Sequence, residues 1–272
     1  MLDSNILDQV RGIFANLDAQ YTFLTSIDKN REEAHEMIDF INDFASTSSH
    51  INVAHTEATA DKLEFSILKN DEHTGITFRG IPNGHEFTSL LLAILNADGK
   101  GKNLPDEAIA RRIKALKGNV KLQTYVSLTC TNCPDIVQAL NIMAIINPNI
   151  SHEMIDGALF QAEADAMKIQ AVPTVYANEK MLHVGRGTLG ELLEKLENEV
   201  GSIADDNFEP VIRHYDVIVV GGGPAGSSAA IYSARKGLKV AVVAENVGGQ
   251  VKETVAIENL ISVPHTTGAE LA

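Results

Sequence analysis

The sequence predicts an α/β protein made of three successive units. Apolar residues alternate along Val120–Leu128 and then recur at helical spacing, and fainter patterns of the same kind fill the first hundred residues. Another strand-like run, followed by a glycine-rich turn, begins near Tyr215 and opens a third unit. The expected units are residues 1–100, 101–200 and 213–272, with a linker at 201–212.

The bulk composition is that of a globular protein. The 272 residues are 44% hydrophobic and carry a formal net charge of −14. This charge repels phosphate backbones and anionic lipids, so neither nucleic acid nor a membrane is an expected partner. No run approaches the roughly 18 apolar residues that span a bilayer, and the N-terminus lacks a signal-peptide pattern. A cytoplasmic location is therefore expected.

The middle unit carries the clearest pattern. Strands are predicted at 120–128, 152–155, 172–176 and 181–184, and helices at 135–147, 159–168 and 188–200. The motif Cys130-Thr131-Asn132-Cys133 lies at the first strand-to-helix junction. This βαβαββα order, with a dithiol at that junction, resembles thioredoxin.

The two cysteines of the chain form a candidate redox pair. A thiolate is the attacking species, and the unpaired N–H groups and dipole of a helix N-terminus lower a thiol pKa. We expect Cys130 to be the exposed nucleophile and Cys133 the buried resolving thiol, with Pro134 in the first helical turn. Thioredoxin-like proteins carry a cis proline against the dithiol, and the resemblance assigns that place to Pro173.

The cysteine pair has two alternative interpretations. Half of a zinc site would need two more ligands, but no other Cys exists and the nine His are scattered without close pairs, so no metal is expected. Two unreactive buried cysteines are the other alternative. A redox dithiol is preferred because Pro173 accompanies the pair.

The first unit has the pattern of a degenerate copy of the second. Residues 21–26 align with 123–128, and 78–80 followed by a helix at 85–95 align with 185–187 followed by a helix. This alignment places Asp28 and Arg31 where the cysteines stand in the second copy. The first copy is therefore expected to keep the fold without the dithiol chemistry.

The last unit opens with a dinucleotide-binding fingerprint. A strand at 215–220, the Gly221–Gly226 turn, a helix ending at Arg235 and a second strand at 238–244 occur in the required order. Gly221 permits the tight turn, Gly223 the approach of a pyrophosphate, and Gly226 close helix–strand packing. Glu245 would accept the ribose hydroxyls. A glycine-rich turn that binds nothing is the alternative.

Longer segments resemble the alkyl hydroperoxide reductase F family. They are Gly84–Leu90 (GHEFTSL), Cys130–Asn141 (CTNCPDIVQALN), Gly221–Gly226 (GGGPAG) and Ile257–Pro264 (IENLISVP). The stretch Gly248-Gly249-Gln250 with Ile257-Glu258-Asn259 also looks like the flavin-binding part of the thioredoxin reductase family. The fold class implied is two tandem thioredoxin-like domains followed by the start of a Rossmann-like FAD-binding domain.

The resemblance implies a homodimeric cytosolic flavoprotein. Electrons would pass from NADH to FAD, to a second dithiol in the nicotinamide domain, then to Cys130 and Cys133, and finally to a peroxiredoxin that reduces alkyl hydroperoxides. Glu86 would assist proton transfer at the dithiol, with an ordinary first-turn helix carboxylate as the alternative. The implied FAD-binding residues are Gly221, Gly223, Pro224, Ala225, Gly226, Glu245, Gly249, Gln250 and Asn259.

The sequence departs from this family at its C-terminal end. It stops at Ala272, without the nicotinamide domain and its dithiol. We therefore expect this polypeptide alone to bind FAD poorly and not to oxidise NADH. Two other functions stay open: a free-standing thioredoxin-like dithiol–disulfide exchange module without flavin, and a non-catalytic interaction module.

Overall fold

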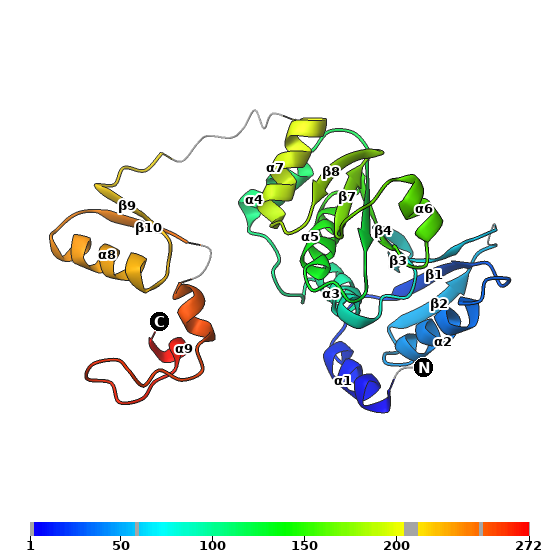
Figure 1. Ribbon diagram of the computed structural model, residues 1–272, viewed down its shortest axis with the longest axis horizontal. Coiled ribbons are helices and arrows are strands. Elements are labelled where there is room, and N and C mark those ends of the chain that lie inside the picture. Colours follow the sequence, from blue (N-terminus) through cyan, green and yellow to red (C-terminus); the bar gives the residue numbers. More distant parts are fainter. Residues whose placement is uncertain (1–2, 58–59, 204–211, 245–246, 272) are drawn as a thin grey trace. The chain divides into compact units, whose positions relative to one another are not determined.

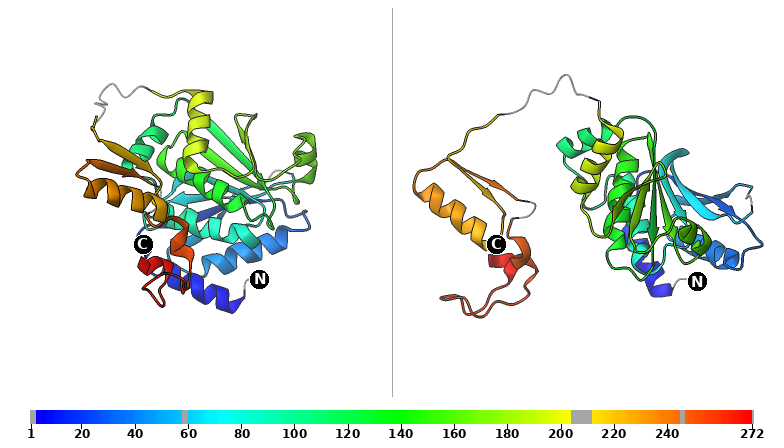
Figure 2. Two further views of the ribbon diagram at one scale, coloured as in Figure 1. Left: turned by 60° about the vertical axis from the view of Figure 1, so that its left-hand side comes forward. Right: turned by 45° about the horizontal axis from the view of Figure 1, so that its top comes forward.

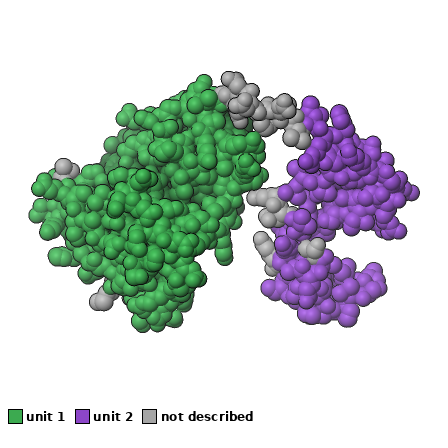
Figure 3. Space-filling view, turned by 180° about the vertical axis from the view of Figure 1, so that it is seen from behind, with its two compact units in different colours: residues 1–205 green, residues 206–272 purple. Residues whose placement is uncertain are grey.

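The computed structural model describes residues 3–57, 60–203, 212–244 and 247–271 (Figure 1). The chain separates into two compact units, residues 1–205 and 206–272 (Figure 3). Each unit has its own sheet. The linker predicted at 201–212 contains residues 204–211, which lie outside the described residues.

The first unit contains eight strands, seven α-helices and one short 3-10 helix among its described residues. The strands are β1 (Tyr21–Ile27), β2 (Ile51–His55), β3 (Leu63–Lys69), β4 (Glu72–Arg79), β5 (Val120–Val126), β6 (Ile150–Asp156), β7 (Thr174–Ala177) and β8 (Lys180–Val184). The helices are α1 (Ser4–Phe14), α2 (Ala34–Ala45), η1 (Gly84–Glu86), α3 (Phe87–Ala97), α4 (Glu107–Lys114), α5 (Cys133–Ile146), α6 (Gln161–Ala166) and α7 (Leu189–Val200).

One sheet runs through both halves of this unit. Its strand order is β2-β1-β3-β4-β6-β5-β7-β8, so one four-strand order occurs twice in succession. The halves join where β4 pairs in parallel with β6, from Ile76 opposite His152 to Arg79 opposite Ile155 (Figure 2). The predicted boundary at 100/101 falls between α3 and α4, but the sheet is continuous across it.

The element bounds correct the predicted alignment of the two halves. β1 and β5, α2 and α5, and β2 and β6 each begin 99 residues apart. Arg31 N–H donates to Asp28 O as Cys130 N–H donates to Ser127 O, at the same offset. Arg31 therefore occupies the place of Cys130, and Ala34 that of Cys133. The prediction that Asp28 and Arg31 replace the cysteines is wrong by three residues, because short strand patterns alone do not fix a register.

The second parts of the halves also align differently from the prediction. Gly80 N–H donates to Leu63 O and Gly185 N–H donates to Pro173 O, both at 2.9 Å. Gly80 thus corresponds to Gly185, not to Gly187, and Leu63 stands where the second half has Pro173. Both glycines have a positive φ, 109° and 84°, which the turn after each strand requires.

Helices cover one face of the sheet much more fully than the other. A single apolar cluster takes side chains from alternate positions of the strands and from α1, α2, α3, α4, α5 and α7. The other face holds a small cluster of Tyr125, Ile155, Ala164 and Tyr176 beneath α6. Because the main cluster spans both halves, packing holds them together as well as the sheet does.

The second unit has a small sheet and a largely exposed apolar surface. Its elements are β9 (Val217–Val220), α8 (Pro224–Arg235), β10 (Val240–Val243), η2 (Gly249–Glu253) and α9 (Gly268–Leu271). β9 and β10 pair in parallel, and α8 follows β9 as the fingerprint predicts. No residue of α8 is buried, and Val220 of β9 is 83% exposed.

Candidate redox site and nucleotide-binding loop

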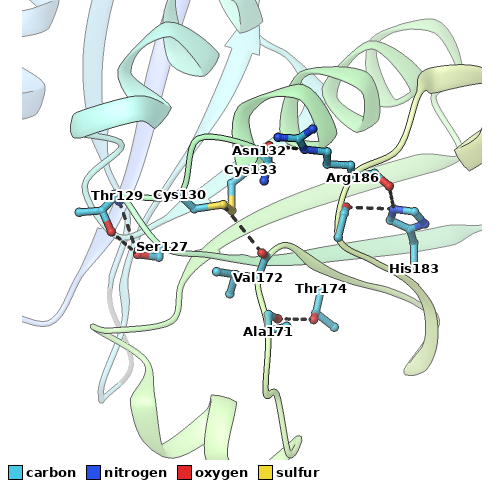
Figure 4. The surroundings of a disulfide bond; sticks show 11 residues. Ser127, Thr129, Cys130, Asn132, Cys133, Ala171, Val172, Thr174, His183 and Arg186 are labelled. Atoms are coloured by element: carbon cyan, nitrogen blue, oxygen red, sulfur yellow. Dashed lines mark hydrogen bonds between the residues drawn. A yellow bond between two sulfur atoms is a disulfide. The ribbon is translucent and has the colours of Figure 1, made fainter.

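The two cysteines lie at the junction between β5 and α5 and form a disulfide. Their Cα atoms are 5.5 Å apart, and Cys133 is the first residue of α5 (Figure 4). Cys133 is fully buried, whereas Cys130 is only partly buried. The sulfur expected to attack is therefore the one nearer to solvent.

The N-terminus of α5 has no side-chain cap. Asn132 precedes the helix without accepting a hydrogen bond from it, and Pro134 in the first turn has no N–H to satisfy. The remaining first-turn N–H groups have no helical acceptor. They can stabilise a negative charge on the sulfur that precedes them, which favours a thiolate at Cys130.

The segment Ala171–Thr174 lies against the disulfide. The carbonyl oxygen of Val172 is 3.8 Å from Sγ of Cys130, and the Val172–Pro173 peptide bond is cis, as predicted. Thr174 Oγ1 donates to Ala171 O at 2.6 Å, and Gly185 N–H donates to Pro173 O. These two hydrogen bonds hold the loop, and Figure 4 shows the one between Thr174 and Ala171.

Glu86 lies where the first half meets the loop that carries the cysteines. His85 N–H donates to Leu128 O at 3.1 Å, and a Cβ atom at Gly84 would lie 2.5 Å from that same oxygen. Gly84 has a φ of +55°, so both the backbone and the close approach favour glycine. This contact places η1 against the residue two positions before Cys130.

The Glu86 carboxyl group is buried without a hydrogen bond. The residue is 0% exposed, and neither carboxyl oxygen has a partner of ordinary geometry. Burial raises the pKa of Glu86 to about 7, and the Asp135 carboxylate acts in the same direction. The nearby Ser89 hydroxyl acts in the opposite direction. Glu86 can therefore gain or lose a proton near neutral pH.

An arginine beside the dithiol is a site residue that the sequence did not predict. Nε of Arg186 donates to Oδ1 of Asn132 at 2.7 Å, and Figure 4 shows this pair beside the disulfide. Asn132 lies between the two cysteines, so Arg186 joins the β8–α7 loop to the motif. The sequence pattern indicates Arg186 only as part of the segment 185–187 that aligns with 78–80 in the first half. The signal in the sequence is that Arg186 closely follows the strand predicted to pair with the strand of Pro173, which brings the two residues to the same end of the sheet.

The glycine-rich turn of the second unit has the geometry that its sequence predicts. Gly221 has a φ of +116°, and a Cβ atom at Gly226 would overlap the carbonyl oxygen of Gly221. A Cβ atom at Gly223 would meet no atom within 4 Å, which leaves open space beside the turn. Pro224 and Ala225 begin α8, whose first turn has no side-chain cap.

The other predicted FAD-binding residues are only partly brought together. Gly248 N–H donates to Gly222 O at 2.7 Å, and a Cβ atom at Gly249 would lie 3.1 Å from the Cα atom of Gly223. Gln250 and Asn259 are exposed, without a hydrogen bond to the turn among the described residues. Glu245 lies outside the described residues.

The turn fits the pyrophosphate of a dinucleotide. Its uncapped helix N-terminus offers N–H donors, and the missing side chain at Gly223 leaves room for the phosphates to approach them. Within the described ranges, no cluster of three or more His, Cys, Asp or Glu side chains is placed to hold a metal ion. The described helices include none that is long and apolar enough to cross a membrane.

Comparisons with known proteins match both units. A thioredoxin domain family matches residues 120–198, and a pyridine nucleotide-disulphide oxidoreductase family matches residues 215–269. A Bacillus subtilis protein named NADH dehydrogenase is 44% identical over 272 residues, and the F subunit of Pseudomonas aeruginosa alkyl hydroperoxide reductase is 42% identical over 273 residues. Each alignment covers 100% of this chain and 52% of the relative, so the chain spans about half the length of the curated relatives it matches.

Solved structures of the same kind of protein also resemble the first unit. The NTD_N/C domain of alkylhydroperoxide reductase AhpF from Enterococcus faecalis is 32% identical with a TM-score of 0.66, over 72% of this chain and 100% of that one. A protein disulfide oxidoreductase from Aeropyrum pernix, 18% identical with a TM-score of 0.64 over 74% of this chain and 95% of its own, shares the fold. The predicted fold class, thioredoxin-like domains followed by the start of a pyridine nucleotide-disulphide oxidoreductase domain, is confirmed. The chain belongs to the alkyl hydroperoxide reductase F family.

Proposed function

We propose that this chain carries the dithiol step of a flavin-dependent disulfide reductase that serves a peroxiredoxin. The observation that carries the proposal is the Cys130–Cys133 disulfide at the uncapped start of α5, against Val172 and Pro173. A reducible disulfide in this setting, on a chain of this family, is suited to thiol–disulfide exchange. The peroxiredoxin would in turn reduce alkyl hydroperoxides.

The exchange proceeds in two balanced steps. The Cys130 thiolate attacks one sulfur of the partner's disulfide, forms a mixed disulfide and expels the other partner sulfur as a thiolate. The Cys133 thiolate then attacks Cys130 Sγ, which restores the intramolecular disulfide and expels the second partner thiolate. Two electrons leave the chain, and the partner's two thiolates become thiols by taking up two protons.

Glu86 is the proposed proton acceptor for the second step. Cys133 is buried, so its thiol needs a nearby group that can take its proton before attack. Glu86 is buried at the same junction, lacks a hydrogen bond and has a pKa of about 7. These properties are those of a general base at neutral pH rather than of a surface carboxylate.

The second unit is proposed to hold FAD. Gly221, Gly223 and Gly226 with Pro224 and Ala225 would bind the pyrophosphate, Gly249 would line the turn, and Glu245, Gln250 and Asn259 are proposed from the sequence alone. When bound, FAD would relay the electrons of NADH towards the disulfide. We also propose a cytoplasmic homodimer, on the family resemblance.

The deciding experiment transfers electrons from the chemically reduced protein to an oxidised peroxiredoxin. The wild type should reduce the partner's disulfide, Cys130→Ser should not, and Cys133→Ser should accumulate a mixed disulfide visible on a non-reducing gel. Equal rates for the wild type and Cys130→Ser would contradict the mechanism.

One observation favours a second function, a dithiol exchange module without flavin. The first unit alone contains the disulfide, the cis Val172–Pro173 bond beside it and the buried Glu86. A protein purified without FAD that still reduces the peroxiredoxin after chemical reduction would support the exchange module. Bound flavin in stoichiometric amount would support the flavoprotein.

A further inference from the structure

Arg186 holds an uncompensated positive charge at the rim of the dithiol. Its Nε is bound to the Asn132 amide at 2.7 Å, and its side chain is exposed. Within the described parts of the chain, neither terminal nitrogen of this guanidinium has a hydrogen bond, and no carboxylate lies within salt-bridge distance. The group therefore presents free N–H donors beside the reactive sulfur atoms (Figure 4).

Four other arginines of the first unit form ion pairs with carboxylates. Arg11 pairs with Asp8, Arg31 with Glu33, and Arg112 with Glu197. Arg79 is bound by Glu163 and lies near two more glutamates. Arg186 differs from these four arginines, because its partner is the neutral amide of Asn132 beside the reactive cysteines.

The backbone of Arg186 is held as firmly as its side chain. Nε2 of His183 donates to the carbonyl oxygens of Gly185 and Arg186, at 3.0 and 2.9 Å. Nδ1 of His183 then accepts from Lys195 Nζ at 2.7 Å. Gly187 has no room for a side chain, because a Cβ atom there would lie 2.7 Å from His183 Nε2. The guanidinium is therefore presented in a preset direction, and little side-chain entropy is lost when it binds.

We propose that Arg186 recognises a carboxylate that flanks the disulfide of the protein this dithiol reduces. A guanidinium with free terminal nitrogens matches the two oxygens of a carboxylate, which can bridge both in a charge-assisted pair. Such a contact would hold an acidic segment of the partner while its disulfide lies over Cys130. The inference rests on the proposed function and names the chemistry of its substrate.

The test uses matched disulfide peptides and the full chain in its reduced form. Two cyclic peptides differ only at the residue next to the cystine, Asp in one and Asn in the other, and hydroxyethyl disulfide serves as an uncharged substrate. The wild type should reduce the Asp peptide about threefold to fivefold faster than the Asn peptide, with the difference in KM. Arg186→Gln should remove this preference, and Arg186→Lys should keep part of it.

A control variant separates recognition from general attraction. Arg11→Gln removes one charge from α1 and should keep the preference for the Asp peptide. Arg11→Gln should reduce hydroxyethyl disulfide at the wild-type rate, whereas Arg186→Gln should lose less rate on hydroxyethyl disulfide than on the Asp peptide. A preference that survives in Arg186→Gln would overturn the inference, and so would an equal loss of rate on hydroxyethyl disulfide, which would place the effect on the dithiol itself. Failure of the wild type to reduce any of the three substrates would instead contradict the proposed function.

Discussion

Gly84 lies against the carbonyl oxygen of Leu128, so closely that a Cβ atom at position 84 would be 2.5 Å from it. The contact joins the first half of the unit to the loop that carries the cysteines. It is accompanied by the hydrogen bond from His85 N–H to the same oxygen. The half without a dithiol therefore helps to fix the position of the half that has one.

Gly84→Ala should destabilise the first unit and displace the dithiol loop. Its positive φ and the clash with Leu128 both act against a side chain, so we expect a loss of about 2 kcal/mol or more in the free energy of unfolding. Urea unfolding measures the loss, and the alkylation rate of Cys130 in the reduced protein reports on the loop. Gly12→Ala is the matched control, since nothing lies within 4 Å of its Cβ position in α1. That variant should gain up to about 1 kcal/mol, and similar results for both variants would contradict the argument.

Glu86→Gln should change how stability depends on pH. The pKa of Glu86 is raised in the folded protein to about 7, from 4.5, so its carboxyl group ionises more readily in the unfolded chain. Stability linked to this group is complete below about pH 4.5 and is lost as the pH rises through 7, by about 3 kcal/mol. The wild type should therefore weaken from pH 5 to pH 8 relative to Glu86→Gln in urea unfolding.

A surface glutamate provides the comparison for Glu86. Glu107 is exposed in the first turn of α4, and Glu107→Gln should change the free energy of unfolding at pH 7 by at most about 0.5 kcal/mol. If the free energies of unfolding of the wild type and of Glu86→Gln change equally between pH 5 and pH 8, folding does not raise the pKa of Glu86. The proposed base would then lose its main support.

Most strands and helices with a clear local signal could be predicted from the sequence. Alternation placed the strand at Val120 correctly, and Pro134 and the glycines of Gly221–Gly226 marked true helix starts. Helix α4 was not predicted, although Asp106 caps it by accepting from Ile109 N–H at 2.8 Å. The missed signal was an N-cap aspartate after Pro105 and before a short amphipathic run.

Long-range relationships could not be predicted in the same way. The parallel pairing of β4 with β6 joins residues more than seventy positions apart, and no local pattern specifies it. The bond between Arg186 and Asn132 has the same character, because it depends on where two loops end after folding. Strand composition alone does not determine how the two halves align, whereas the starts of α2 and α5, 99 residues apart, do.

Arg79→Met should be among the most destabilising substitutions on the face of the sheet that α6 covers. Its terminal nitrogens donate to both oxygens of Glu163, at 2.9 and 2.6 Å, and its guanidinium lies 4.5 Å from the centre of the Phe160 ring. Removal leaves the partly buried Glu163 carboxylate with the Tyr125 hydroxyl as its partner and without a cation, so we expect a loss of about 2 kcal/mol in urea unfolding. Arg112→Met breaks a more exposed bidentate pair with Glu197 and should cost at most about 1 kcal/mol. Equal losses for the two variants would show that burial does not govern the Arg79 pair.

Asp98→Asn should remove an acid-sensitive part of the stability. The Asp98 side chain is 1% exposed and accepts hydrogen bonds from the backbone N–H groups of Asp18 and Ala19, both at 3.0 Å. Tyr21 Oη donates to it at 3.0 Å, and Lys100 Nζ also lies 3.0 Å away. These contacts tie the end of α3 to the segment that leads into β1.

The pKa of Asp98 sets the direction of this effect. Burial alone would raise the pKa, but the hydrogen bonds from Asp18, Ala19, Lys100 and Tyr21 lower it to about 2. Because the folded pKa lies below the ordinary value of 3.8, the linked stability is present above about pH 4 and is lost as the pH falls towards 2.

Asp98→Asn should cost about 2 kcal/mol at pH 7 and show a smaller further loss on acidification. Urea unfolding at pH 7, 4 and 2.5 measures both effects, with Asp8→Asn, an exposed carboxylate on α1, expected to stay within about 0.5 kcal/mol of the wild type at pH 7. An acid loss in Asp98→Asn as steep as that of the wild type would show that other carboxylates govern it.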